Sequence, residues 1–186
     1  MNSHFPDKID ESWSLFLDRD GVINKRIIDG YVQNKSQFHL IDGVVKAIDI
    51  FKEVFGYVFV VTNQQGVGKG IMTEEDLFDV HNYMQELIGI QFDRIYFCPS
   101  LAEENSPMRK PSIGMAMKAQ KDFPSVDFSK SIMVGDSSGD ILFGKNAGMK
   151  TVYISPDETT KEADLNCLSL YHFAQILINN IAADLS

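Results

Sequence analysis

The sequence predicts an α/β fold, in which a parallel sheet of about five strands carries helices on both faces. The main observation is an alternation along the chain between short apolar runs and stretches whose apolar residues recur with a period of 3.6. The chain has 186 residues, 44% of them hydrophobic, which is typical of one globular domain with a sizeable core. We therefore expect a single domain over residues 1–186, with its core at about 13–155.

Five apolar runs are the predicted strands. The run YVFVV at 57–61 is the clearest, because a continuous β-branched and aromatic segment is typical of a buried parallel strand. In chain order the predicted strands are Ser14–Leu17, Tyr57–Val61, Ile95–Cys98, Ser131–Val134 and Thr151–Ile154.

Helical patterns lie between and after these strands. Val44, Ile48 and Phe51 share one helical face, and Thr73 to Asp76 resemble a capping box at the start of the second helix. Gly148 is placed to end the fourth. The predicted helices are Val44–Phe55, Glu74–Ile88, Ile113–Phe123, Asp140–Asn146 and Tyr171–Ala182.

Composition and charge exclude several classes of protein. The formal net charge of −9 disfavours nucleic-acid binding through phosphate neutralisation. No segment has the roughly 20 apolar residues of a membrane span, and residues 1–12 do not resemble a secretory signal. The 2 cysteines cannot form a disulfide framework. We expect a cytoplasmic protein, as a monomer or weak homodimer, without nucleic-acid or membrane partners.

Polar residues stand where the predicted strands end. The carboxyl ends of parallel strands meet at one edge of a sheet, so these residues are expected to converge there. A single aspartate after a strand is most often a helix N-cap, and only the combination indicates a functional site. The residues are Asp18 and Asp20, Thr62 and Asn63, Arg109 and Lys110, and Asp136 and Asp140.

Phosphoryl transfer is the chemistry that fits this combination. A phosphate ester repels an anionic nucleophile unless a cation neutralises the site. Asp18 and Asp136, with the main-chain carbonyl of Asp20, offer the hard oxygen ligands that suit Mg²⁺. We expect Asp18 to be a covalent nucleophile, and Asp20 to protonate the leaving oxygen and then deprotonate water.

The remaining strand-end residues have supporting roles in this scheme. Thr62 is expected to donate a hydrogen bond to the transferring phosphoryl group, and Lys110 to offset its charge and that of Asp18. Asp140 is expected to hold a metal-bound water rather than the metal itself.

Four segments together resemble the motifs of the haloacid dehalogenase (HAD) superfamily: DRDGV at 18–22, VTN at 61–63, KP at 110–111, and GD at 135–136 with Asp140. The resemblance covers about residues 13–155. It implies a Rossmann-like three-layer sandwich, Mg²⁺, and hydrolysis of phosphomonoesters through an aspartyl-phosphate. The intervals between the motifs leave no room for a cap domain, so we expect a capless form of this fold.

Longer segments resemble the subfamily of heptose 1,7-bisphosphate phosphatases and, less closely, the related histidinol-phosphatase domains. They include DRDGVIN at 18–24, VVTNQQGVGKG at 60–70 and RKPSIGM at 109–115. The resemblance implies a small phosphorylated substrate, such as a sugar phosphate. By position it implies that the following residues bind this substrate: Arg19, Gly30, Tyr31, Asn63, Gln64, Gln65 and Arg109.

The sequence departs from this subfamily at its zinc loop. Cys98 stands where the first zinc cysteine falls, but Ser100 replaces the histidine and no cysteine precedes Arg109. One thiolate cannot complete a tetrahedral site, so we expect no structural zinc. Cys98 is then expected to be a small buried residue at the end of the third strand.

Several further expectations concern the cleft and its surroundings. Lys25, Arg26, Lys69 and Arg109 are candidates for contacting a second phosphate. The glycines at 66, 68 and 70 suggest a flexible loop that could act as a lid. His81 is expected to be a surface or packing residue rather than a ligand.

Two other functions fit the motifs. One is hydrolysis of histidinol phosphate or another small metabolite. The other is a receiver-like module that holds an aspartyl-phosphate as a signal. A proton-transferring carboxylate at Asp20, two residues after the nucleophile, favours turnover over a persistent phosphorylated state.

Overall fold

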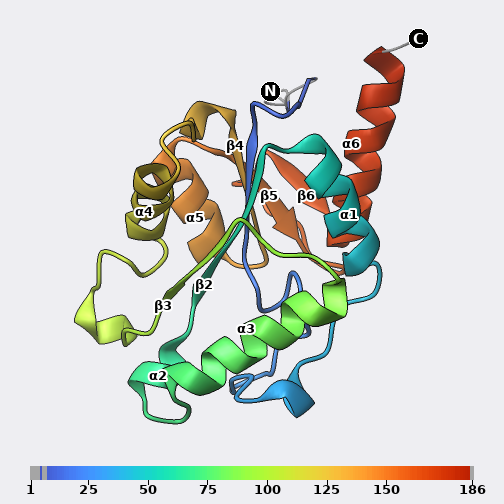
Figure 1. The fold of residues 1–186 in the computed structure, drawn as a ribbon. Coiled ribbons are helices and arrows are strands. Elements are labelled where there is room, and N and C mark those ends of the chain that lie inside the picture. Colours follow the sequence, from blue (N-terminus) through green and yellow to red (C-terminus); the bar gives the residue numbers. More distant parts are fainter. Residues whose placement is uncertain (1–4, 6–7, 185–186) are drawn as a thin grey trace.

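The computed structural model describes residues 5 and 8–184, and side chains in the last helix up to Ile181. The expectation for residues 1–12 falls in part on residues 1–4 and 6–7, outside the described part of the chain. Figure 1 shows one twisted sheet, blue to red along the chain, with helices on both faces. Six parallel strands form this sheet in the order β3-β2-β1-β4-β5-β6. The strands are β1 (Ser14–Leu17), β2 (Tyr57–Asn63), β3 (Arg94–Cys98), β4 (Ser131–Gly135), β5 (Lys150–Ile154) and β6 (Leu165–Cys167).

The helices form the outer two layers of a three-layer sandwich, as predicted. α1, α3 and α6 cover one face of the sheet, and α4 and α5 cover the other (Figure 1). Their bounds are α1 (Val44–Val54), α2 (Gln65–Gly68), α3 (Glu74–Ile88), α4 (Gly114–Asp122), α5 (Ser138–Ala147) and α6 (Leu170–Asp184). Three short 3₁₀ turns, η1 (Lys35–Gln37), η2 (Ala102–Glu104) and η3 (Phe128–Lys130), lie in the connections.

The predicted elements are present, and the differences have local causes. β6 was missed because its sequence, LNC, has only three residues and no apolar run. β2 extends to Asn63, so that Thr62 and Asn63 end the strand rather than follow it. α5 starts at Ser138 because Ser137 and Asp140 form a capping box, whereas the prediction began this helix at Asp140.

The expected flexible glycine loop is wrong. Residues 65–68 form the short helix α2, in which a side chain at Gly66 would lie 3.0 Å from the Tyr31 ring. A side chain at Gly68 would lie 2.4 Å from the carbonyl oxygen of Pro99. Gly66 and Gly68 therefore permit close packing of α2 against two loops, whereas Gly70 follows the helix with a φ of 67° and open space around it.

Two apolar cores hold the layers together. On one face, Leu15, Leu17 and Val134 pack with α1, α3 and α6. On the other face, Phe16 and Met133 pack with α4 and α5. Neighbouring residues of each strand thus point to opposite faces and both are buried, which accounts for the continuous apolar runs in the sequence.

The order of the strands fixes where a ligand can bind. The chain moves from β1 outward to β2 and β3, and then returns to place β4 on the other side of β1. The helices after β1 and β4 therefore lie on opposite faces, which leaves a crevice beyond the carboxyl ends of these two strands. Within the described residues, neither the β1–β2 nor the β2–β4 connection contains a separate cap domain, so this crevice is covered only by loops.

No helix in the described part of the chain has the length and apolar character needed to cross a bilayer.

The packing of α6 tests whether the molecule unfolds as one unit. Phe173 is fully buried, with its ring centroid 5.5 Å from that of Phe51 on α1. Phe173→Ala should lower the free energy of unfolding by about 3–5 kcal/mol, and Ile178→Ala, 43% exposed on the same helix, by less than about 1 kcal/mol. Urea denaturation followed by circular dichroism measures both. A separate early transition in the Phe173→Ala variant would contradict the single-domain prediction.

Candidate active site

Asp18 is the first residue after β1 and lies in the crevice between β1 and β4. Its amide donates to the carbonyl oxygen of Val134 at 2.9 Å, which extends the β1–β4 ladder by one residue. The residue is 8% exposed, and its Oδ1 accepts a hydrogen bond from Lys110 Nζ at 2.8 Å. The end of a buried strand thus presents a carboxylate whose nearest partner is a buried cation.

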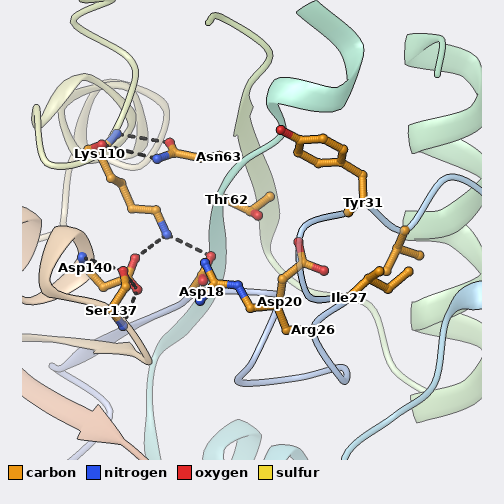
Figure 2. A pocket seen from close by; sticks show the side chains of 12 residues that line it. Asp18, Asp20, Arg26, Ile27, Tyr31, Thr62, Asn63, Lys110, Ser137 and Asp140 are labelled. Atoms are coloured by element: carbon orange, nitrogen blue, oxygen red, sulfur yellow. Dashed lines mark hydrogen bonds and ion pairs between the residues drawn. The ribbon is translucent and has the colours of Figure 1, made fainter. Parts of the chain in front are cut away.

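Lys110 reaches this carboxylate from the loop before α4, across the pocket (Figure 2). Its ammonium also contacts Asp140 Oδ1 at 2.6 Å and donates to the carbonyl oxygen of Val61 at 2.8 Å. Asn63 holds the Lys110 backbone in place through two hydrogen bonds, of 3.1 and 3.2 Å. A cation with only 3% of its side chain exposed is thereby fixed between two carboxylates.

Asp140 is oriented by the start of α5. Its Oδ2 accepts hydrogen bonds from the Ser137 amide at 3.1 Å and the Ser137 hydroxyl at 2.6 Å, which leaves Oδ1 directed at Lys110. Gly135 allows this arrangement, because a side chain there would place its Cβ 2.1 Å from the Cβ of Asp140. Both carboxylate oxygens have protein partners, which fits the expected supporting role of this residue.

Asp136 follows β4 and lies against Gly21. A Cβ at Gly21 would lie 1.9 Å from Asp136 Oδ2, and Gly21 has a φ of 92°. Both observations require glycine at this position. Asp136 Oδ2 accepts a hydrogen bond from Arg26 at 3.3 Å, whereas its Oδ1 is buried without a partner among the described residues.

These carboxylates form a cluster suited to a divalent cation. Carboxylate oxygens of Asp18, Asp136 and Asp140 lie within 4.8 Å of one another, the one such group found among the described residues. Burial is the largest effect on Asp18 and raises its pKa to about 7, and burial likewise raises the pKa of Asp136 to about 6. Lys110 and Arg26, the cations paired with these three carboxylates, leave part of their negative charge uncompensated. Asp136 Oδ1, which has no partner among the described residues, is an oxygen that could ligate a metal ion.

Asp20 lies in a different electrostatic environment from Asp18. Its carboxylate accepts hydrogen bonds from Arg19 at 2.9 and 3.0 Å, from Asn24 at 2.9 Å and from Gln64 at 2.8 Å. Burial alone would raise the pKa of Asp20, but the Arg19 charge and these hydrogen bonds together hold it below its ordinary value. Figure 2 shows Asp18 and Asp20 beside the same pocket.

The pocket next to Asp18 has a volume of about 130 Å³, smaller than the roughly 300–1,000 Å³ of typical small-molecule sites. Eight of the predicted site residues line it: Asp18, Asp20, Gly30, Tyr31, Thr62, Asn63 and Lys110, and the supporting residue Asp140. Its lining also includes Arg26, Ile27, Val32 and Ser137.

A larger groove of about 1000 Å³ continues from this pocket, and the two share Arg26, Tyr31 and Asn63. Predicted residues Gln65 and Arg109 line the groove rather than the inner pocket, together with Lys69. Lys69 Nζ lies 5.5 Å from the centre of the Tyr31 ring. The groove thus carries three of the four cations proposed for a second phosphate, and Lys25 is not among its lining residues.

Two residues predicted to bind substrate lie beneath the pocket. Arg19 is fully buried and directs its guanidinium at Asp20, Gln64 and His81, away from the pocket lining. Gln64 is 1% exposed, and its amide nitrogen donates to Asp20 and to Thr62 Oγ1, the latter at 2.9 Å. In this arrangement neither reaches a ligand directly.

Sequence reasoning overlooked several residues around the site. Asn24 contacts Asp20 and lies within the quoted segment DRDGVIN, but nothing in the sequence indicates its orientation. Ser137 had a usable signal, the capping-box spacing to Asp140. His81, expected to be a surface or packing residue, is buried. Its Nε2 lies 3.2 Å from Arg19 Nη1.

The loop at the position of the zinc loop is held by hydrogen bonds. Cys98 is fully buried at the end of β3, as predicted, and its nearest polar partner is Ser106 at 3.9 Å. Gln65 Oε1 accepts a hydrogen bond from the Ala102 amide at 2.9 Å, and Arg109 donates to the carbonyl oxygen of Ser100 at 3.2 Å. The absence of zinc stays a prediction.

Comparison with known proteins agrees with this geometry. Residues 107–181 match a family model described as HAD-hydrolase-like. A D-glycero-alpha-D-manno-heptose-1,7-bisphosphate 7-phosphatase of Mycobacterium bovis is 34% identical over 170 residues, which cover 87% of this chain and 90% of that protein. A D-glycero-beta-D-manno-heptose-1,7-bisphosphate 7-phosphatase of Vibrio cholerae is 38% identical over 149 residues, which cover 74% of this chain and 78% of that protein.

The chain belongs to the HAD superfamily, in the same phosphatase family as these relatives. It is therefore an enzyme, a phosphatase, and the predicted family is confirmed. A crystal structure of D,D-heptose 1,7-bisphosphate phosphatase from B. bronchiseptica, complexed with magnesium and phosphate, superimposes with a TM-score of 0.80. It is 24% identical and covers 90% of this chain and 98% of that one, which confirms the HAD fold.

The buried carboxylates predict a pH-dependent stability of this phosphatase without metal. Because the folded-state pKa of Asp18, about 7, exceeds the ordinary aspartate pKa of 3.8, the folded state binds more protons between these values. Stability should therefore fall as pH rises from about 4 to about 7, by up to about 1.4 kcal/mol per pH unit for this residue. Urea unfolding in EDTA, repeated at each pH, measures the slope.

Asp18→Asn should flatten this slope, whereas Asp157→Asn, at an exposed loop position outside the cluster, should not. Added Mg²⁺ should stabilise the wild type more at pH 8 than at pH 5, because the metal requires ionised carboxylates. An unchanged slope in Asp18→Asn would show that the Asp18 carboxylate does not carry this linkage.

Proposed function

We propose that this phosphatase is Mg²⁺-dependent and removes a phosphate from a sugar bisphosphate, with D-glycero-D-manno-heptose 1,7-bisphosphate as its substrate. The observation that carries the proposal is the pairing of a small anion-sized pocket at Asp18 with a wide cationic groove beside it. The names of the relatives support a heptose bisphosphate as the substrate and the phosphate at position 7 as the group that is removed. Relatives of both anomeric names match, so the proposal covers the alpha and the beta anomer.

Asp18 and Asp136, with the carbonyl oxygen of Asp20, would hold Mg²⁺, which neutralises the phosphate so that an anionic nucleophile can approach it. Asp18 then attacks phosphorus, the bond to the sugar oxygen breaks, and Asp20 donates a proton to the departing oxygen. In the second half, Asp20 takes a proton from water as the water oxygen attacks the aspartyl-phosphate, which releases inorganic phosphate and free Asp18. Two carboxylates beside one pocket support this division of work.

Three neighbouring groups would stabilise the transferring phosphoryl group. Thr62 Oγ1 accepts a hydrogen bond from Gln64, so its own hydrogen is available to a phosphoryl oxygen. Lys110 supplies a buried positive charge, and Asp140 holds that ammonium in place. The low pKa of Asp20 does not oppose its acid role, because a phosphate dianion next to it raises that pKa again.

The remaining proposals concern the setting of the reaction. Both cysteines are free and buried, which supports a reducing compartment such as the cytoplasm. The net charge of −9 disfavours nucleic-acid partners, and we propose a monomer or weak homodimer. Histidinol phosphate is the alternative substrate. It ranks second because its imidazole cation matches poorly with a groove that contains Arg26, Lys69 and Arg109. Membership of a phosphatase family favours turnover over a receiver-like phosphorylated state.

Phosphate release with Mg²⁺ tests the proposal on both anomers of heptose 1,7-bisphosphate, on histidinol phosphate and on hexose phosphates. The heptose bisphosphate should give the highest kcat/KM. Asp20→Asn should keep the wild-type circular dichroism spectrum and lower kcat by at least about 100-fold, and Asp18→Asn should abolish turnover. A higher kcat/KM for histidinol phosphate would overturn the substrate. Full activity in Asp18→Asn would overturn the mechanism.

Arg109 tests the second phosphate. Arg109→Ala should lower kcat/KM for heptose 1,7-bisphosphate by about 10-fold, because a charge-assisted contact of about 1.5 kcal/mol is lost. The change for heptose 7-phosphate, which lacks the second phosphate, should be under about twofold. Lys118→Ala, at an exposed ion pair with Asp122 on α4, is the matched control and should change neither value. Equal losses on both substrates would place Arg109 in a general structural role.

A further inference from the structure

Arg19 is the least exposed charged residue of the site. Its sequence position, between the two catalytic aspartates, suggests a substrate contact, yet none of its side chain is exposed to solvent. Its Nη2 donates to both oxygens of Asp20, at 3.0 and 2.9 Å, and to Gln64 Oε1 at 3.3 Å. Its Nη1 faces His81 Nε2 at 3.2 Å, whereas Nε has no partner in the part of the chain that the structure describes. A buried cation in this position acts on the protein and not on the ligand.

His81 is the partner that α3 contributes to this guanidinium. An arginine can only donate hydrogen bonds, so Nε2 of His81 must be the accepting nitrogen and Nδ1 must carry the hydrogen. Burial, reinforced by the Arg19 charge, lowers the pKa of His81 to about 3, which keeps the ring neutral and accepting at physiological pH. His81 thus holds one end of the guanidinium while Asp20 holds the other.

The Asp20 carboxylate depends on this chain of contacts for its orientation. Its side chain is 24% exposed and lines the inner pocket, so it has open space into which it could rotate. Asn24 and Gln64 each bond one of its oxygens, but only Arg19 contacts both. A displacement of the guanidinium would therefore change the direction of the carboxylate relative to Asp18.

We propose that Arg19 and His81 are positioning residues for proton transfer, with His81 fixing the guanidinium that aims the Asp20 carboxylate at the leaving oxygen. The inference rests on the proposed function, in which Asp20 is the general acid. It assigns a role to a buried helix residue that never touches substrate, and it replaces substrate contact as the role of Arg19.

The dependence of rate on the leaving group separates this role from ordinary packing. A poor leaving group, such as the alkoxide at C7 of heptose 1,7-bisphosphate, needs the proton from Asp20, whereas p-nitrophenolate leaves without it. The value of kcat/KM reports only the steps through departure of the leaving group. A misdirected Asp20 therefore lowers kcat/KM for the sugar phosphate selectively, while a merely loosened core lowers both values together.

The experiment compares kcat/KM of His81→Leu on heptose 1,7-bisphosphate and on p-nitrophenyl phosphate, each with Mg²⁺. We expect a loss of about 10-fold on the sugar phosphate and of less than about twofold on the aryl phosphate. His81→Gln, whose amide oxygen can replace the accepting nitrogen, should recover most of the loss. Met84→Ala, at a fully buried position of the same helix, is the control. It should lower the melting temperature, but the ratio of kcat/KM for the sugar phosphate to kcat/KM for the aryl phosphate should stay as in the wild type.

Three outcomes would overturn the inference: equal losses on the two substrates, no loss on either, or no recovery in His81→Gln. Asp20→Asn separates this failure from failure of the proposed function. If Asp20→Asn shows no preference for the aryl phosphate, the general-acid role itself is wrong. A crystal structure of His81→Leu gives a readout independent of activity. If His81→Leu does not fold, a crystal structure of Arg19→Lys takes its place. An unmoved Asp20 carboxylate there would also contradict the inference.

Discussion

The structure of the site depends on a cluster of three carboxylates, two of which are buried against one ammonium. Asp18, Asp136 and Asp140 converge beyond β1 and β4, and Lys110 is the buried cation among them. Isolated buried charges are costly, so such a cluster persists only where its geometry is enforced by the surrounding chain. Glycine at 21 and 135 helps to enforce this geometry, because a side chain at either position would collide with Asp136 or Asp140. The Ser137 cap, which holds Asp140, contributes as well. The remaining negative charge is what makes the site receptive to a divalent cation.

A second network next to this cluster gives Asp18 and Asp20 unlike electrostatic environments. Asp18 has its pKa raised by burial, whereas Asp20 has its pKa lowered, chiefly through the Arg19 charge. Divergent environments for neighbouring carboxylates are the usual means by which one fold assigns them different roles. The divergence arises in the turn after β1, where Arg19 turns into the protein and bonds Asp20, while Asp18 and Asp20 both line the pocket.

The sequence predicted those features that depend on local pattern. Continuous apolar runs mark the strands because both faces of a parallel sheet are buried, and the strand ends then locate the carboxylates. What it could not predict depends on tertiary contact. The approach of His81 to Arg19 joins residues 62 positions apart, and β6 is recognisable only through its pairing with β5. The glycine-rich segment misled for the same reason, since Tyr31 and Pro99 supply the packing that its composition conceals.

The loop between β3 and α4 is fixed by hydrogen bonds from residues that also shape the cleft. Gln65 bridges two loops, because its Oε1 accepts from the Ala102 amide and its Nε2 donates to the Tyr31 hydroxyl at 3.2 Å. Arg109 adds a bond to the carbonyl oxygen of Ser100. Both residues also line the wide groove beside the inner pocket. The loop position and the groove wall therefore depend on the same side chains, so that a change at either residue alters the shape of the groove as well as its polarity.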